Sequence, residues 1–233
     1  MLVHSGCTIT GNYAQGNAQS NAMGGGVYCE DCSTIITNCL ISDNLANYGG
    51  GGGIYSYALA DTEITNCTIV ANTASYGGGL GQANQQTILL NTILWDNNAS
   101  TSQGPEIWMT GGTILQTSYS DVEGGQAMVY IDGTSATLDW GPGMMDLDPI
   151  FVTGPPGNYY LCQPVSDEKS ILWASPCVDA GDPASDMIWG STRTDGRSDT
   201  GIVDMGYHYP LSPWTDHWLE EVPDFGSDPQ IQE

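Results

Sequence analysis

The sequence predicts an all-β protein built as a parallel β-solenoid, and two observations support this: a returning motif and glycine runs that follow it. Residues 36–44 return as residues 64–72, return in weaker form at 89–97, and are preceded by a shorter version at 7–12. The asparagines that close these motifs, at positions 12, 44, 72 and 97, are separated by 32, 28 and 25 residues. Periods of this size are typical of repeat architectures.

Each repeat has a second half, in which a glycine run leads into a short apolar segment. These stretches are residues 24–28, 49–55 and 77–80. Their Val, Ile and Tyr residues favour strands, and the apolar spacing does not follow the helical period of about 3.6 residues. We therefore expect two short strands per repeat, separated by turns, and no helix.

Strands this short cannot bury an apolar face alone, so the repeats must stack about 4.8 Å apart, with equivalent side chains above one another. We expect an inward column of small side chains at Cys7, Cys39, Cys67 and Thr92. A second inward column is apolar: Ile9, Ile41, Ile69 and Leu94. A third column lies at a bend and consists of Asn12, Asn44, Asn72 and Asn97. Asparagine tolerates left-handed backbone angles, and stacked amides can satisfy unpaired bend carbonyls.

Composition and charge exclude several partners. The chain has 233 residues, 40% of them hydrophobic, which is enough for one core of ordinary size. Its formal net charge is −24, and its only cationic residues besides histidine are Lys169, Arg193 and Arg197. Nucleic acid requires clustered Lys and Arg, so it is excluded, and anionic membrane surfaces are disfavoured for the same reason. No apolar run reaches roughly 18 residues, so we expect no membrane span.

The repeat resembles the right-handed parallel β-helix repeat family, the pectate-lyase-like solenoids of large secreted bacterial proteins. Segments of the C-terminal half follow the end of such a solenoid in order: residues 118–125, 140–143, 146–151, 175–183, 193–196 and 199–210. Met144 and Met145 depart from the Asn-Ile pair expected there. The resemblance implies coils over residues 1–160, an irregular C-terminal cap over 161–210, and an acidic, Trp-containing tail over 211–233. The family carries no single activity, so function stays open.

The cysteines of the cap indicate a compartment. The resemblance implies a disulfide between Cys162 and Cys177, which pins the cap and places the protein in an oxidising environment, outside the cell or on its surface. Cys29 and Cys32 have the CxxC spacing, but a redox role needs a helix N-terminus to lower a thiol pKa. A solenoid bend supplies none, so we expect a local disulfide or two free thiols there.

Aspartates of the C-terminal part form a candidate calcium site: Asp179, Asp182, Asp195, Asp199 and Asp204. Backbone carbonyls of Gly196 and Gly201 lie on the same turn-rich loop, and hard oxygen donors without nitrogen or sulfur suit Ca²⁺. The alternatives are Asx-turns on a solvated acidic face, or ion pairs with Arg193 and Arg197 that hold the cap together.

No residue set amounts to a catalytic signature. The resemblance implies that uronate-cleaving solenoids use an Arg or Lys base, and no Lys or Arg precedes Lys169. Inverting hydrolysis needs two carboxylates about 6.5–9.5 Å apart. Asp43 and Asp96 each precede a ladder asparagine, but Ala71 lies on the coil between them. The histidines have no Ser or Cys partner within sequence reach, so we expect surface or cap roles for His4, His208 and His217.

Aromatic residues form a candidate sugar-stacking row: Tyr28, Tyr48, Tyr55 and Tyr76. Tyr28 and Tyr55 each follow an inward residue, so they should point outward and stack. Such rows can bind sugar rings, and they also stabilise sheets without any ligand.

The ends of the chain suggest self-association. Met1 leads directly into the first repeat without a signal peptide or the usual N-terminal coils, so we expect a longer gene product or a processed fragment. The exposed first edge needs cover from upstream residues, a partner or another copy. Candidate contacts in the tail are Trp214, Trp218, Leu219 and Phe225. Head-to-tail contact without ring closure would generate a filament.

The sequence therefore predicts an extracellular structural or adhesive solenoid module that self-assembles head-to-tail or continues upstream. The alternative is a polysaccharide-binding or polysaccharide-degrading protein. The lack of outer-face cations on the coils favours the non-enzymatic role.

Overall fold

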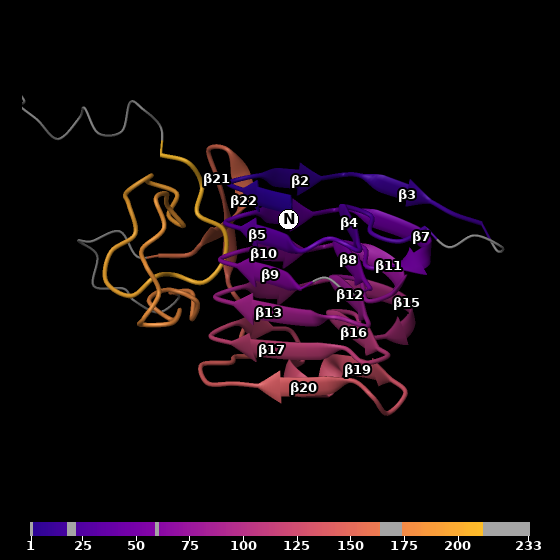
Figure 1. Cartoon of the computed structure of the whole chain (residues 1–233). Helices are drawn as coiled ribbons and strands as arrows, with labels where there is room; N and C mark the ends of the chain where they lie inside the picture. Colours follow the sequence, from indigo (N-terminus) through magenta and orange to yellow (C-terminus); the bar gives the residue numbers. More distant parts are fainter. Residues whose placement is uncertain (1, 18–21, 59–60, 164–173, 212–233) are drawn as a thin grey trace, which may run out of the picture.

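The structure, a computed structural model, describes residues 2–17, 22–58, 61–163 and 174–211. In this part the chain winds into stacked coils whose strands form four parallel sheets, so the predicted all-β solenoid is confirmed (Figure 1). The N-terminal coil lies at one end of the stack, and β19 and β20 lie at the other.

The first sheet contains, in spatial order, β1 (Leu2–Ser5), β5 (Thr34–Thr37), β9 (Thr62–Thr65), β13 (Gln86–Leu90), β17 (Ile114–Ser118) and β20 (Thr137–Trp140). The second contains β2 (Thr8–Thr10), β6 (Leu40–Ser42), β10 (Thr68–Val70), β14 (Ile93–Trp95) and β18 (Asp121–Val122). The third contains β3 (Tyr13–Gln15), β7 (Leu45–Gly50), β11 (Thr73–Tyr76) and β15 (Asn98–Gln103). The fourth contains β4 (Val27–Glu30), β8 (Ile54–Tyr57), β12 (Leu80–Ala83), β16 (Ile107–Thr110) and β19 (Val129–Asp132).

A complete coil has four strands where the sequence predicted two. A left-handed residue divides the repeated motif, and the stretch that follows the motif forms a further strand, such as β7. Asn38 (φ 49°) and Asp43 (φ 57°) bracket β6, and Asn66 (φ 51°) and Ala71 (φ 56°) bracket β10 in the same way. A left-handed residue turns the chain sharply, and Asn and Asp accept this conformation at low cost. The repeated motif therefore encodes a corner, a short strand and a second corner.

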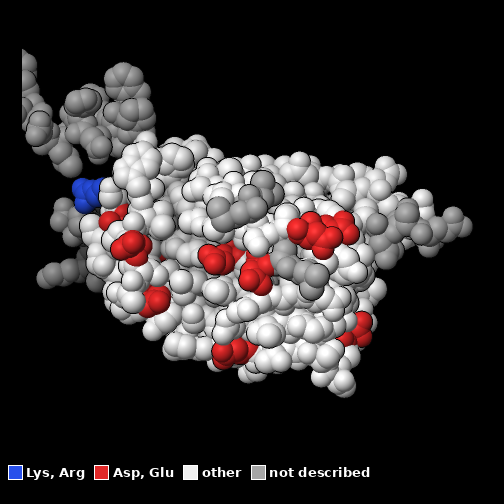
Figure 2. Space-filling view, viewed as in Figure 1, with Lys and Arg blue, Asp and Glu red and all other residues white. Residues whose placement is uncertain are grey.

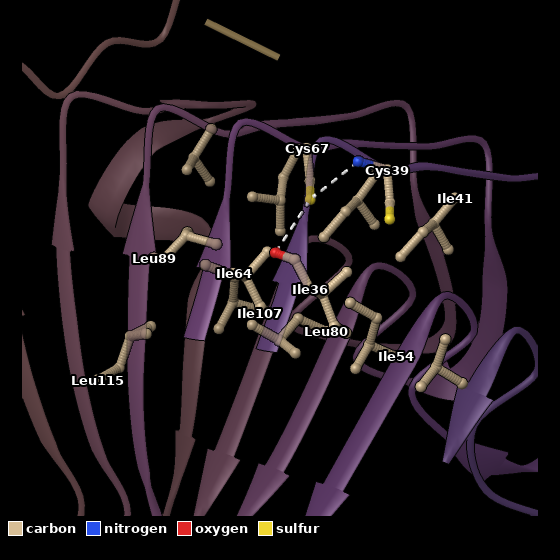
Figure 3. Close-up of a cluster of buried hydrophobic side chains, with 14 of the residues drawn as sticks. Ile36, Cys39, Ile41, Ile54, Ile64, Cys67, Leu80, Leu89, Ile107 and Leu115 are labelled. Atoms are coloured by element: carbon tan, nitrogen blue, oxygen red, sulfur yellow. Dashed lines mark hydrogen bonds between the residues drawn. The ribbon is translucent and has the colours of Figure 1, made fainter. Parts of the chain in front are cut away.

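The apolar columns fill the interior of the coils, as predicted. Ile69 pairs with Ile41 on one side and Leu94 on the other, and all three side chains are fully buried. Figure 3 shows this interior, where the side chains of Ile54, Leu80 and other coil residues converge from the surrounding sheets.

The column of small side chains is a hydrogen-bonded ladder, which the sequence argument treated only as packing. Cys67 Sγ accepts a hydrogen bond from the Cys39 amide at 3.4 Å (Figure 3). Thr92 Oγ1 accepts one from the Cys67 amide at 3.3 Å. Ser120 Oγ continues the series by accepting from the Thr92 amide at 3.1 Å. The position requires a short side chain that both donates and accepts, so Cys, Thr and Ser replace one another there.

The part of the chain after the coils is irregular and lies along their side (Figure 1). It begins with the hairpin β21 (Phe151–Gly154) and β22 (Gly157–Leu161), and residues 174–211, here called the lateral segment, follow. The resemblance implies an irregular C-terminal cap in this region. Its hydrogen bonds instead reach successive coils, since they join Asp182 to Asn91, Tyr207 to Thr68, and His208 to Asn38.

The expected Cys162–Cys177 disulfide is not formed in the structure, where both residues are free cysteines. The reason is the orientation of Cys177, whose buried thiol donates to Asp121 Oδ2 at 3.2 Å on the coil side. Cys29 and Cys32 are also free thiols, which is one of the two outcomes expected for them.

We predict that Ile69→Ala lowers the free energy of unfolding by about 2–5 kcal/mol, because it leaves a cavity in a narrow core. The matched control is Ile88→Ala on β13, whose side chain is 39% exposed. The control should change stability by less than about 1 kcal/mol. Urea unfolding of both variants checks this, and equal losses would contradict the assigned register.

Candidate functional site

The asparagine column forms a continuous hydrogen-bonded ladder that is exposed at Asn12 and buried at Asn44, Asn72 and Asn97. The backbone amide and side-chain Nδ2 of Asn44 both donate to Oδ1 of Asn72, at 3.0 and 2.9 Å. Asn12 donates to Asn44, and Asn72 to Asn97, in the same way. Each of these side-chain oxygens thus accepts the hydrogen bond of a backbone amide at the bend of the preceding coil. The ladder has a direction, because the asparagine of the earlier coil is always the donor.

The ladder ends on a carboxylate that the sequence argument missed. The Asn97 amide donates to Glu106 Oε1 at 3.0 Å, and Asn97 Nδ2 donates to Glu106 Oε2 at 2.6 Å. Glu106 is only 1% exposed, and burial raises its pKa to about 8, with a further rise from nearby Glu123. Protonation neutralises a buried charge that has no cationic partner among these contacts.

A break in the glycine pattern marks this end of the ladder in the sequence. Glu106 occupies the coil position held by Gly53 and Gly79 on earlier coils. A Cβ at Gly79 would lie 3.0 Å from Asn97 Nδ2, so glycine leaves room for the asparagine of the next coil. Where the pattern reads Gly104-Pro105-Glu106 instead, the side chain takes the place of a further asparagine.

An open groove of about 670 Å³ lies beside this terminus. It is lined by Asp96, Asn97, Asn98, Pro105, Glu106, Glu123, Gly124 and Met128. Glu123 Oε2 accepts a hydrogen bond from the Asp96 amide at 2.7 Å, which links two successive coils across the groove. Three of the lining side chains are carboxylic acids and none is Lys or Arg.

The two aspartates that were considered for inverting hydrolysis, Asp43 and Asp96, lie on coils separated by one further coil. Asp43 and Asp96 are exposed corner residues, and Ala71 occupies the corner between them. Tyr159 of β22 and Ala71 pack against the same hydrophobic cluster, and the pKa of Tyr159 is raised mainly by burial and further by the charges of Asp43 and Asp96. The Tyr159 ring therefore lies near enough to both aspartates to feel their charges.

The candidate calcium ligands take part in internal hydrogen bonds. Asp204 accepts from the side chains of Thr192 and Gln163 and from the Asp179 amide, and its pKa is raised chiefly by burial. Asp199 Oδ2 accepts from the Asp204 amide at 2.8 Å and lies 3.1 Å from Nε2 of buried His208. These three side chains form one network in the lateral segment.

Asp182 and Asp195 have other partners. The amide of Asp182 donates to Asn91 on the coils. Arg193 forms a salt bridge with Asp195 at 2.6 Å and Arg197 lies 3.8 Å away, so the ion-pair alternative describes this residue. The hydrogen bond from Arg193 is the main cause that lowers the pKa of Asp195. Within the described ranges, no group of three or more His, Cys, Asp or Glu side chains is arranged to hold a metal ion. Calcium binding stays a prediction.

The aromatic row divides into packed and exposed members. Tyr28 and Tyr55 stack with ring centroids 6.1 Å apart, but Tyr55 is only 4% exposed. Tyr76 packs against Trp108 at 4.5 Å, so its ring is part of the protein's own packing. Tyr28 and Tyr48 are about half exposed and are the members available to a ligand.

Carboxylates are spread over the face of the coils in Figure 2, and cationic side chains appear only where the lateral segment lies. No helix among the described residues has the length and apolar character required to span a membrane. The predicted self-association residues are Trp214, Trp218, Leu219 and Phe225, and they lie outside the described residues.

Residues 2–139 match the family described as the right-handed β-helix region. The chain belongs to this family. The match runs from β1 into β20, and it agrees with the stacked parallel sheets and with the resemblance found in the sequence. No curated protein and no solved structure matches the chain.

We predict that the stability of the protein falls as the pH rises from about 4.5 to about 8, because of Glu106. Its pKa is raised from 4.5 to about 8 on folding, so the folded state holds one more proton in this window than the unfolded state. Glu106→Gln should remove this part of the pH dependence and cost about 1–3 kcal/mol at pH 5, since one ladder hydrogen bond loses its acceptor.

Urea unfolding at several pH values measures this effect. Glu63→Gln, at an exposed position on β9, is the matched control and should keep the pH dependence of the unaltered protein. An unchanged pH dependence in Glu106→Gln would contradict the assignment.

Proposed function

We propose that this protein is an extracellular, non-catalytic structural module of the right-handed β-helix family that serves in adhesion at a surface. The observation that carries this proposal is that the polar side chains that repeat from coil to coil form hydrogen bonds inside the protein. The amides of Asn44 and Asn72 and the hydroxyl of Thr92 are buried and hydrogen-bonded between coils. They stiffen the coil stack and are not presented to a substrate.

The proposed location outside the cell rests on the resemblance to solenoids of secreted bacterial proteins. The net charge of −24 supports a role in which the module stays soluble and separate from anionic surfaces. Exposed Tyr28 and Tyr48 are the side chains that we propose for weak contact with polysaccharide.

Polysaccharide cleavage is the second candidate, and one observation favours it: Glu106, whose pKa is raised by burial, lines the same groove as Glu123 and Asp96. General acid catalysis requires the acid to reach the leaving group. Both Glu106 oxygens accept hydrogen bonds from Asn97, and the side chain is buried. We therefore assign Glu106 a structural role and keep binding without cleavage as the proposal.

Filament formation is not part of the proposed function. Head-to-tail stacking that continued the asparagine ladder into a second copy would require a residue of that copy to accept the hydrogen bonds of Asn97. Glu106 already accepts both hydrogen bonds of Asn97, and so it closes the ladder at that end.

We expect the purified protein to bind polysaccharide without releasing reducing ends. A panel of pectin, alginate, chitin and cellulose, with calcium and with EDTA, measures retention and reducing-end release in the same samples. Tyr28→Ala should lower retention about threefold or more, whereas Tyr13→Ala, which alters a similarly exposed tyrosine on β3, should not. Release of reducing ends would reject the non-catalytic proposal.

The calcium prediction has its own measurement, the melting temperature of the protein. A higher melting temperature in calcium than in EDTA would support the predicted calcium site.

A further inference from the structure

Three side chains of the lateral segment converge on one amide group, that of Gln163, which follows β22 by two residues. Its side-chain nitrogen Nε2 donates to Thr192 Oγ1 and to Asp204 Oδ2, both at 2.8 Å. Its oxygen Oε1 accepts a hydrogen bond from Arg193 Nη1 at 3.0 Å. Arginine has no acceptor and an ionised carboxylate has no donor, so these contacts fix which atom of the amide is the oxygen. The amide of Gln163 is therefore held between a hydroxyl, a carboxylate and a cation.

The hydroxyl of Thr192 is placed as a nucleophile. It donates to Asp204 Oδ2 and accepts from Gln163 Nε2, so a lone pair of its oxygen faces the amide. Because a C–N amide bond is about 1.3 Å long, the amide carbon of Gln163 lies within about 4.1 Å of Thr192 Oγ1. Reacting atoms need to approach to about 3–3.5 Å, which is within reach of a small rotation of the amide. A hydroxyl that is hydrogen-bonded to a base is the usual form of an activated nucleophile.

The surroundings favour attack on this amide. Arg193 is held in place by Asp195, which accepts from its Nε and Nη2 at 2.9 and 2.6 Å. The fixed guanidinium can stabilise the negative charge that develops on the Gln163 oxygen when the carbon is attacked. Thr192 and Asp204 are each only 1% exposed, so water has little access to the reacting hydroxyl or to a product formed there.

We propose that Thr192 and Gln163 react with each other to form an ester cross-link. Thr192 Oγ1 forms a bond to the amide carbon of Gln163, the C–N bond of the amide breaks, and the nitrogen leaves as ammonia. Asp204 takes the proton of the hydroxyl and passes it to the departing nitrogen, to which it is already hydrogen-bonded. The atoms balance without an oxidant, a reductant or a cofactor.

The cross-link would join two residues 29 positions apart and tie the lateral segment to the hairpin. Closing a loop of this length removes conformational freedom from the unfolded chain, which stabilises the folded state. This inference goes beyond the proposed adhesive function and does not depend on it, because it concerns a bond within the chain and requires no ligand.

Trypsin gives a direct test, because it cuts between the two residues, after Lys169. Gln163 then lies in the peptide 1–169 and Thr192 in the peptide 170–193. The protein is prepared in EDTA, so that calcium does not occupy the carboxylates, and is denatured before digestion. We expect the intact protein to be lighter by one ammonia and the two peptides to stay joined, as measured by mass spectrometry.

Two treatments identify the bond that joins the peptides. Reduction and alkylation before digestion exclude a disulfide between Cys162 and Cys177, which lie in the same two peptides. Hydroxylamine cleaves esters and spares amides, so it should separate the joined peptides.

Variants test the role of each group, with circular dichroism to check folding. Thr192→Val removes the nucleophile and should give the full mass and separate peptides, whereas Thr192→Ser keeps a hydroxyl and should keep the link. Asp204→Asn removes the base and should slow formation of the link about 100-fold or more. The matched control is Thr194→Val, which removes an exposed hydroxyl two residues away and should leave the link intact.

The unaltered protein alone can decide against the proposal, so a variant that fails to fold does not prevent the test. Separate peptides in the digest of the unaltered protein, or joined peptides that resist hydroxylamine, would overturn it. A link that persists in folded Thr192→Val would also overturn it, because another nucleophile would then be responsible.

Discussion

The fold depends on one repeated interaction, the bidentate hydrogen bonding of each ladder asparagine to the next coil. Oδ1 of Asn72 accepts both the amide and the side-chain nitrogen of Asn44, so one side chain fixes the corner of the preceding coil and the spacing between two coils. The glycines at 53 and 79 follow from it, because any larger side chain there would meet the asparagine of the next coil. Corner geometry, sheet register and the glycine pattern are consequences of the same contact.

The sequence predicted the features that repeat and missed the features that occur once. The columns at Ile41 and Asn44 were readable because they recur with similar neighbours. Glu106 was not readable, since only the three-dimensional stack shows that this carboxylate takes the place of an asparagine. The division of each motif at Asn38 was missed for another reason: an isolated asparagine is compatible with both extended and left-handed backbone.

The candidate site illustrates the same limit. The resemblance placed Cys177 in a cap but did not give its partner, because that partner lies far away in sequence, whereas the salt bridge of Asp195 with Arg193 was among the alternatives expected from the sequence. Cys177 bonds to Asp121, 56 residues earlier, and Asp195 forms a salt bridge with Arg193, only two residues away. Long-range contacts such as that between Cys177 and Asp121 are set by how the lateral segment crosses the coils, which no local pattern encodes.

The lateral segment also determines the order in which the chain can complete its structure. A solenoid alone needs only neighbouring coils and can stack progressively as it leaves the ribosome. The contact of His208 with Asn38, however, joins residues 170 positions apart. The earliest coils therefore wait for nearly the whole described chain before their side is covered, and we expect the closing of this long loop to be slow compared with the stacking of neighbouring coils.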